Sequence, residues 1–285
     1  YEFNSLFALQ TAVLSQKRTD LAAVSQTLIP FYLPTPTGDG TYGYIAGGYT
    51  GSLVAVGTID KLEYSTDTTT SSTSFNLVLP RYKLAGLSEN INKGYFTGGV
   101  ESSQTYSTER LTYSPEAISQ VSSLDLQQPT DSLAGISEGI TKGYFVGGVT
   151  DAETNIITKI IFSPETRQTL TTATLTEPRT AIATIDGQGL KGYISGGSVE
   201  AGFSSLMTEV MYYTVDTPYQ VSTAVLSDAR RYLAGVGNRE NKGYFAGGIG
   251  ASYDLIDRVA FSTDTTSAVT SDVLSVGRFG LAGVS

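Results

Sequence analysis

Short segments in which apolar and polar residues alternate run along the whole chain and repeat about every fifty residues. No stretch sustains the i, i+3, i+4, i+7 apolar spacing of a helix. A hexad Gly-Tyr-(Phe/Ile)-x-Gly-Gly starts at Gly43, Gly94, Gly143, Gly192 and Gly243, in steps of 51, 49, 49 and 51 residues. A segment similar to Leu-Ala-Gly-Val-Ser keeps the same period and starts at Leu21, Leu84, Leu133, Ile182, Leu233 and Leu281. The pattern predicts repeated units built from β-strands.

Each unit contains four such segments, separated by Gly, Ser, Thr, Asn or Pro. We call the expected strands A (Leu-Ala-Gly-Val), B (Gly-Tyr-Phe-x-Gly-Gly), C (for example 257–261) and D (for example 269–274). Four antiparallel strands per unit at this period are typical of a β-propeller blade, and a solenoid of β-hairpins is the alternative. Strand C carries a recurring aromatic residue, at Tyr64, Tyr113, Phe162, Tyr212 and Phe261.

The predicted fold is therefore an all-β propeller of four-stranded antiparallel blades, with five full blades and a sixth shared by the two termini. Each unit has a position three residues before strand A, which is arginine in all units but one. The strand C aromatic lies 17 or 18 residues before this position, and Tyr1 lies 17 residues before Arg18. The sixth blade would lack strand B, and a fragment of a longer repeat array is the competing explanation. We expect one domain over 1–285, with units at about 19–81, 82–130, 131–179, 180–230 and 231–278, and a split blade of 1–18 with 279–285.

Small residues and aromatic residues have separate expected roles in strands A and B. The innermost strands crowd around the axis, which favours small side chains. The Gly-Gly pair that ends strand B permits a positive φ. Successive residues of a strand point to opposite faces, so the Tyr and Phe rings of strand B should pack against the two neighbouring blades.

The order arginine, Leu-Ala-Gly-Val, Gly-Tyr-Phe-x-Gly-Gly, variable loop and aromatic residue resembles the kelch repeat over essentially the whole chain. Kelch blades usually carry a Trp after the aromatic, where this chain has aliphatic residues. The repeats are also similar to degenerate, Trp-less repeats of phage tail and surface proteins. The kelch resemblance implies a propeller that recognises peptides on one face. The aliphatic substitutes are Leu9, Val121, Leu170, Val221 and Val269.

Composition excludes much catalytic chemistry. The chain has no Cys, His or Trp, so it has no thiol nucleophile, no Ser-His-Asp triad and none of the usual zinc or copper ligand sets. Copper oxidases and sialidases that share the propeller scaffold need residues that are missing here. We therefore expect no enzyme activity, no cofactor and no metal.

Charge and hydropathy narrow the range of possible partners. The net charge of −9 repels nucleic acid, and no apolar run is long enough to span a membrane. Charged residues make up only 16% of the chain, which leaves a surface of uncharged polar groups. This composition suits a virion or an extracellular or cell-surface location.

The candidate binding residues lie on one face of the expected ring. Antiparallel connectivity places the D–A and B–C loops together, so arginines three residues before strand A should gather at the mouth and hold an anionic or acidic peptide group. Each arginine could instead tie its own blade through carbonyl or carboxylate groups. Tyr49 and Tyr253 follow the Gly-Gly pairs of their units. The arginines are Arg18, Arg81, Arg179, Arg230 and Arg278, and Thr130 is the single departure.

The first A–B loop carries an insertion around residues 26–42 that is rich in proline and apolar residues. Apolar side chains in a protruding loop either fold back on the blade or contact a partner. The candidate partner-contact residues are Ile29, Phe31, Tyr32 and Leu33.

These features favour a non-catalytic structural or interaction propeller, an assembly or receptor-recognition module of a virion tail or cell surface. Its partners would be other proteins of an assembly, or a surface receptor or glycan. A lectin-like propeller is the first alternative, with Tyr49, Tyr106, Phe203 and Tyr253 stacking on sugars. A glycoside-cleaving enzyme is the second, because a loop carboxylate pair could act. The loop acids are Glu101, Asp151, Glu153, Glu200 and Asp254, without a repeated pattern.

Overall fold

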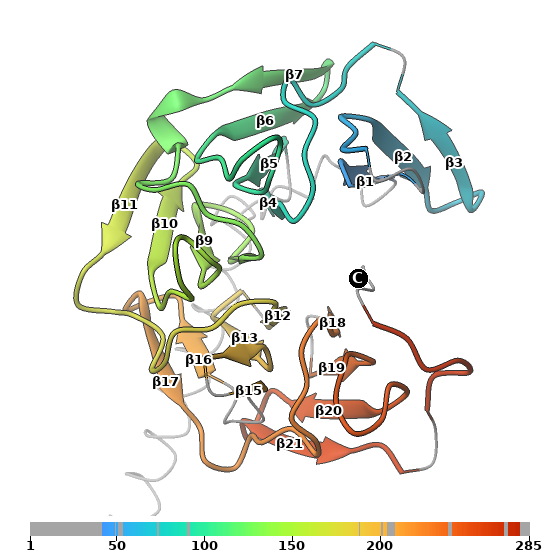
Figure 1. The fold of residues 1–285 in the computed structure, drawn as a ribbon, viewed down its shortest axis with the longest axis vertical. Coiled ribbons are helices and arrows are strands. Elements are labelled where there is room, and N and C mark those ends of the chain that lie inside the picture. The colour runs from blue at the N-terminus through green and yellow to red at the C-terminus, as the bar shows by residue number, and fades with distance from the viewer. Residues whose placement is uncertain are drawn as a thin grey trace, which may run out of the picture.

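The computed structural model describes residues 42–279, except 49, 51–53, 73, 90–91, 188, 201, 204–208, 239–240 and 271–272. The described residues form five antiparallel sheets arranged in a ring, and Figure 1 looks down the axis of this ring. The protein is an all-β propeller, as predicted. We call the sheets blades 1 to 5, in chain order.

Four blades have four described strands, and blade 1 has three. Blade 1 contains β1 (Tyr42–Ala46), β2 (Ile59–Glu63) and β3 (Thr68–Ser71). Blade 2 contains β4 (Ala85–Glu89), β5 (Lys93–Thr97), β6 (Thr108–Tyr113) and β7 (Glu116–Gln120), followed by the 3-10 turn η1 (Ser122–Leu124). Blade 3 contains β8 (Ala134–Ser137), β9 (Lys142–Val146), β10 (Ile157–Ile161) and β11 (Thr166–Leu170).

Blade 4 contains β12 (Ala183–Gly187), β13 (Lys191–Ser195), β16 (Glu209–Tyr212) and β17 (Thr217–Gln220). Its B–C loop carries a separate two-stranded hairpin of β14 (Ser198–Val199) and β15 (Gly202–Phe203). Blade 5 contains β18 (Ala234–Gly237), β19 (Lys242–Ala246), β20 (Ile256–Ala260) and β21 (Thr265–Ala268). In blades 2 to 5 the strands follow the expected order A to D, and consecutive strands pair.

The ring order in Figure 1 runs from blade 1 in blue to blade 5 in red, with strands A innermost and strands D outermost. On the right of this view, no described sheet lies between blade 1 and blade 5. The expected split blade of 1–18 with 279–285 falls outside the described residues, apart from Phe279. The first strand A, at Leu21, also falls outside them.

Blades pack through the two aromatic positions of strand B, as their alternation predicts. The Tyr144 ring belongs to a buried cluster with Met211 and Tyr213 of blade 4. The adjacent Phe145 belongs to a cluster with Ala85 and Tyr95 of blade 2. One blade therefore contributes one ring to each of its two neighbours.

Glycine is required where backbones approach closely. Gly147, the first of a Gly-Gly pair, has φ of 61°, and a Cβ there would lie 2.4 Å from the Arg179 carbonyl oxygen. In strand A, a Cβ on Gly235 would lie 2.1 Å from the Thr184 carbonyl oxygen of the preceding blade. Small residues in strands A and B therefore set the spacing between blades.

Two details of the sequence interpretation are wrong. In blade 4, Tyr213 and not Tyr212 occupies the recurring aromatic position, since Tyr213 stacks on Tyr144 with ring centroids 5.8 Å apart. The spacing to Arg230 thereby becomes 17 residues, as in the other units. Strand D of blade 5 is Thr265–Ala268 rather than 269–274. The hairpin turns early because Asp264 adopts a φ of 51°, a conformation that Asp tolerates well.

Candidate functional site

Three of the predicted mouth arginines are buried. Arg81 and Arg230 are 0% exposed and Arg179 is 1% exposed. Each pairs with a carboxylate on strand C of its own blade: Arg81 with Glu109, Arg179 with Glu209, and Arg230 with Asp257. We call this arrangement the arginine clasp. It corrects the prediction of a ligand-binding basic ring for these three residues, because their guanidinium groups have no solvent-exposed surface to offer a ligand.

The clasp joins three parts of a unit. Arg81 donates to the carbonyl oxygens of Ser107 and Phe96, each at 3.2 Å. The Glu109 carboxylate accepts hydrogen bonds from the backbone N–H of Val78 at 2.7 Å and of Leu79 at 3.3 Å. The clasp therefore ties the incoming D–A segment to strands B and C. Burial lowers the pKa of Arg81, and the nearby Glu109 carboxylate opposes this shift.

Clasps in blades 4 and 5 repeat this geometry. The Glu209 carboxylate accepts from the backbone N–H of Thr176 at 3.1 and 3.2 Å. The Asp257 carboxylate accepts from the backbone N–H of Ser227 at 3.2 and 3.3 Å. Thr176 and Ser227 both stand three residues before the arginine, as Val78 does. The clasp is thus a structural element of the repeat.

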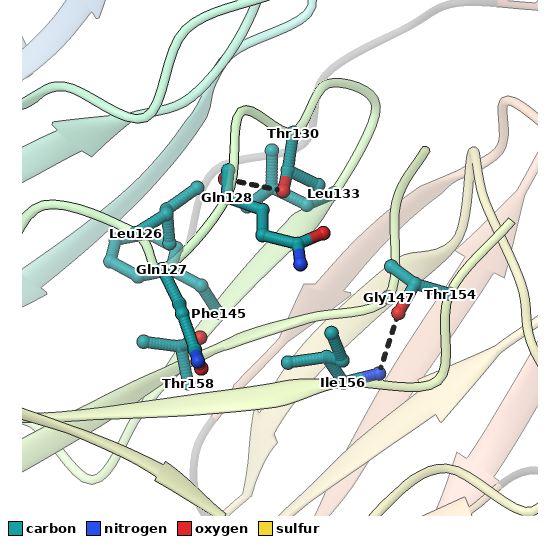
Figure 2. Close-up of a pocket in the computed structure, with 10 residues that line it drawn as sticks. All are labelled: Leu126, Gln127, Gln128, Thr130, Leu133, Phe145, Gly147, Thr154, Ile156 and Thr158. Carbon is teal, nitrogen blue, oxygen red and sulfur yellow. Dashed lines mark hydrogen bonds between the residues drawn. The ribbon is translucent and has the colours of Figure 1, made fainter. Parts of the chain in front are cut away.

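Blade 3 lacks both members of the clasp. Thr130 stands at the arginine position, and Thr158, opposite Phe145 in the strand register, stands at the carboxylate position. Both threonines line a cavity of about 20 Å³ (Figure 2). The Thr130 hydroxyl donates to the Gln128 carbonyl oxygen at 3.0 Å, which satisfies it locally. The cavity has room for about one water molecule. It is too small for a sugar or a peptide side chain.

A second repeated arrangement joins neighbouring blades, and the sequence interpretation missed it. The strand B tyrosine of one blade stacks on the strand C aromatic of the next, and its hydroxyl donates to an acid three residues after that aromatic. Tyr95 stacks on Phe162 and donates to Glu165 at 3.0 Å. Tyr193 stacks on Phe261 and donates to Asp264 at 2.6 Å. We call this arrangement the interblade bridge.

Lysine or arginine completes each interblade bridge. Glu165 also pairs with Lys93 at 3.2 Å and Arg110 at 2.8 Å. Asp216 accepts from Tyr144 and pairs with Lys142 at 2.7 Å and Lys159 at 2.5 Å. The same contacts join Tyr44 and Lys61 to Glu116, and Lys191 to Asp264. Two sequence patterns accompany this bridge: an acid three residues after the aromatic, and Lys-Gly-Tyr at the start of strand B, which blade 1 replaces with Tyr42-Gly43-Tyr44.

The bridges shift the ionisation of their members. Burial opposes ionisation of Asp216, but hydrogen bonds from Lys142, Lys159 and Tyr144 outweigh it and lower the pKa of this carboxyl to about 2. The pKa of Glu165 is lowered by the same balance. Burial and the neighbouring carboxylate raise the pKa of Tyr144. The carboxylates of Asp216 and Glu165 are thus stabilised in their charged form.

The face that carries the B–C loops is where the residues that vary between units lie. Single backbone β-pairings join the D–A segments to the starts of these loops, for example Asp131 to Val149 and Arg231 to Ile249. The D–A segments and the B–C loops therefore share one face. Tyr106 is 52% exposed and Tyr253 is 44% exposed. We call this the loop face. Its acids are Glu101, Asp151 and Glu200, which are exposed, and Glu153 and Asp254, which are half-buried.

Of the predicted site residues, the structure brings Arg278 and Tyr253 together. The Arg278 N–H donates to the Tyr253 carbonyl oxygen at 3.0 Å, and Arg278 is exposed. The Tyr253 ring lies 6.2 Å from that of Phe279, centroid to centroid. The other predicted residues lie outside the described part of the chain: Arg18, Tyr49, Ile29, Phe31, Tyr32 and Leu33.

Within the described residues, no group of three or more acidic side chains is placed to hold a metal ion. The described part of the chain also contains no helix with the length and hydropathy to span a membrane. No protein-family model matches the chain, and no curated protein matches it either.

Proposed function

We propose that this protein is a non-catalytic interaction propeller whose partner binds the loop face. One observation carries the proposal: most described charged residues that recur from unit to unit are used within and between blades, whereas exposed tyrosines and acids that differ between units lie on one face. The clasp residues Arg81, Arg179 and Arg230 are buried, and Tyr106 and Tyr253 are exposed. A rigid scaffold that presents variable loops is a common basis for recognition.

The chemistry of the loop face indicates the kind of partner. It carries both exposed acids and exposed tyrosines, and tyrosine supplies large contact areas at protein interfaces. Since Arg81, Arg179 and Arg230 are buried, these exposed acids fit a protein surface that carries lysine or arginine. This replaces the acidic peptide that an exposed arginine ring would have favoured.

The broader role that we propose is assembly or attachment on a virion tail or a cell surface, in a protein built from kelch-type repeats. The repeat order and the low content of charged residues support this role. No nucleic acid partner is proposed, since the net charge is −9.

The experiment isolates the chain with its partner from native material by cross-linking and then measures affinity. Tyr106→Ala and Tyr253→Ala together should weaken binding at least roughly tenfold, as truncation of central interface aromatics does. The matched control is Tyr219→Ala, an exposed tyrosine on the outer strand β17. A monomeric, unattached protein that hydrolyses glycoside substrates would contradict the proposal.

A lectin-like function is the second candidate, favoured by the same exposed rings. Tyr106 and Tyr253 are open to solvent and could stack on pyranose rings. They occupy different positions in their loops, so each would make a separate site. Binding on a glycan array that is lost with Tyr253→Ala or Tyr106→Ala would favour the lectin over the protein-binding module.

We also propose the sixth blade position, shared by the two terminal segments. Ile45 of blade 1 is 54% exposed, whereas Phe145, Ile194 and Phe245 at the same repeat position are at most 2% exposed. The Gly248 N–H donates to the Arg278 carbonyl oxygen at 3.0 Å. The Gly48 N–H makes the same contact to the Arg81 carbonyl oxygen at 2.8 Å, so Arg278 follows blade 5 in the way that Arg81 follows blade 1. These features support a further neighbour between blades 5 and 1.

A further inference from the structure

The face opposite the loop face carries the A–B loops and the C–D turns, and we call it the turn face. Antiparallel connectivity places these loops and turns together. The ion pairs of the interblade bridges also lie there, because their lysines begin strands B and their acids stand at the C–D turns. The proposed function makes no use of the turn face.

Three aliphatic side chains are open to solvent on the turn face of blades 3 and 4. Leu190 is 62% exposed, Val215 is 57% exposed and Ile140 is 46% exposed. Ile140 and Leu190 lie in the A–B loops of blades 3 and 4, and Val215 lies in the C–D turn of blade 4. We call these three residues the apolar patch.

Backbone contacts hold the parts of the apolar patch close to one another. The Tyr213 N–H, two residues before Val215, donates to the Leu190 carbonyl oxygen at 3.0 Å. A Cβ on Gly189 would lie 3.8 Å from the carbonyl oxygen of Glu138, which belongs to the A–B loop of blade 3. The patch therefore spans two neighbouring blades, and exposed apolar groups gathered in this way mark a contact with another protein.

Two opposite charges stand on the turn face at the two ends of the described ring. Lys242 begins β19 of blade 5, Asp67 lies in the C–D turn of blade 1, and both are exposed. Among the residues that the structure describes, neither belongs to an ion pair. Their counterparts Lys191 and Asp264 do pair, at 2.5 Å. Asp67 and Asp264 have φ of 53° and 51°, so the blade 1 turn already has the shape that accepts a lysine.

A second copy of the chain fits both features. Consider a twofold axis across the ring, through blade 3 and the place between blades 5 and 1 (Figure 1). With turn face against turn face, this axis exchanges blade 1 with blade 5 and brings each Lys242 towards Asp67 of the second copy. It places Ile140 beside its own counterpart. It also lays the rest of the apolar patch over the C–D turn of blade 2, where Pro115 is exposed.

We propose that the protein forms a twofold dimer through its turn face, with the apolar patch against the second copy and two symmetric ion pairs between Lys242 and Asp67. Such an interface uses the same surface on both copies, so each contact occurs twice. The dimer leaves both loop faces pointing outward, free for the partner proposed above. The inference depends neither on that partner nor on what fills the sixth blade position.

The first test is the oligomeric state of the full chain, measured by sedimentation equilibrium. The wild type should dissociate reversibly from dimer to monomer. Leu190→Asp should raise the dissociation constant at least roughly 100-fold, because it buries an unpaired charge on both copies. The matched control Val225→Asp should not, since Val225 is 41% exposed but lies in the D–A segment of blade 4. A wild type that stays monomeric, or equal effects of the two variants, would overturn the proposal.

The second test exchanges the charges of the ion pair. Lys242→Glu and Asp67→Lys should each weaken the dimer roughly tenfold, because each puts like charges together at two symmetric contacts. The chain that carries both changes should recover the wild-type affinity, since the pair is then only reversed. Losses that add in the double variant, or growth into larger species, would refute the twofold arrangement.

Both tests are separate from the other measurements. They do not involve the loop face, so a failure of the proposed function, read from Tyr106→Ala and Tyr253→Ala, is seen independently. Below the dissociation constant the chain is monomeric, and its melting temperature then does not report the dimer contact.

Discussion

At the scale of single residues, the arginine clasp explains which charges the repeat retains. A buried ion pair is costly to break, because removing one partner leaves an uncompensated charge inside the protein. Blade 3 has neither Arg nor acid at these positions and carries Thr130 and Thr158 instead. Both partners therefore change together in this chain, as the physics of a buried pair requires.

This dependence predicts a strong coupling between Arg179 and Glu209. Each single substitution, Arg179→Thr or Glu209→Thr, should cost about 3–5 kcal/mol of unfolding free energy, because it leaves the other charge buried alone. The double variant, which copies blade 3, should cost clearly less than the sum of the two. Urea unfolding of the four proteins measures the coupling, and additive effects would show that the two side chains act independently.

At the scale of elements, the packing of strands and the interblade bridges hold the blades together. The interblade bridges lie at strand B and at the C–D turn, and the innermost strands meet where glycine allows close approach. These contacts join elements some 70 residues apart, for example Lys142 and Asp216. Each blade is thereby fixed by its neighbours rather than by its own core alone.

The bridge at Asp216 predicts a pH dependence with a definite sign. Its folded pKa of about 2 is below the usual value of 3.8, so the unfolded chain takes up the proton first as the pH falls. The stabilisation is complete above about pH 5 and is lost towards pH 2. Asp216→Asn should lower the melting temperature at pH 6 and flatten its fall between pH 5 and 2.5.

The control for this prediction is Asp67→Asn, since Asp67 holds the same repeat position in blade 1 but is exposed. It should leave the melting temperature at pH 6 almost unchanged. Melting curves of wild type and Asp216→Asn that stay parallel from pH 6 to pH 2.5 would argue against the bridge.

The close approach of strands A predicts that Gly235→Ala is destabilising. Its Cβ would lie 2.1 Å from the Thr184 carbonyl oxygen, so the two strands would have to separate. Overpacking of this kind costs about 1–3 kcal/mol or more. Gly86→Ala is the matched control, because its Cβ would lie 3.4 Å from the Phe96 ring, an ordinary contact. Chemical unfolding compares the two, and equal stability would contradict the proposed packing.

At the scale of the whole molecule, the ring was predictable from the sequence because its signals repeat. The fifty-residue period predicted the repeated blades. The Gly-Gly pairs predicted the positive φ values, and the alternation of side chains along a strand predicted that Tyr144 and Phe145 face opposite neighbours. The burial of Arg81, Arg179 and Arg230 was harder to predict. The same repeated arginine is expected whether its side chain binds a ligand at the mouth or forms a clasp inside its own blade.

Long-range contacts are what the sequence could not reveal. The acids that pair with these arginines lie 27 to 30 residues further along the chain, and their side of strand C becomes clear only from the register. Tyr212 was misassigned because two tyrosines stand side by side and only their packing distinguishes them. The interblade bridges join residues whose repeat positions were visible but whose pairing crosses two units.

We propose, as the central point, that the recurring charged residues hold the propeller together and that the variable residues of the loop face contact a partner. Thermal unfolding of Arg81→Ala and Arg230→Ala, beside the exposed control Arg167→Ala, tests it most directly. The account predicts that each of the first two lowers the melting temperature by roughly 6–20 °C, because each leaves a buried carboxylate without its cationic partner. The control should leave the melting temperature unchanged. Unchanged melting temperatures for Arg81→Ala and Arg230→Ala, together with weakened partner binding, would contradict the account.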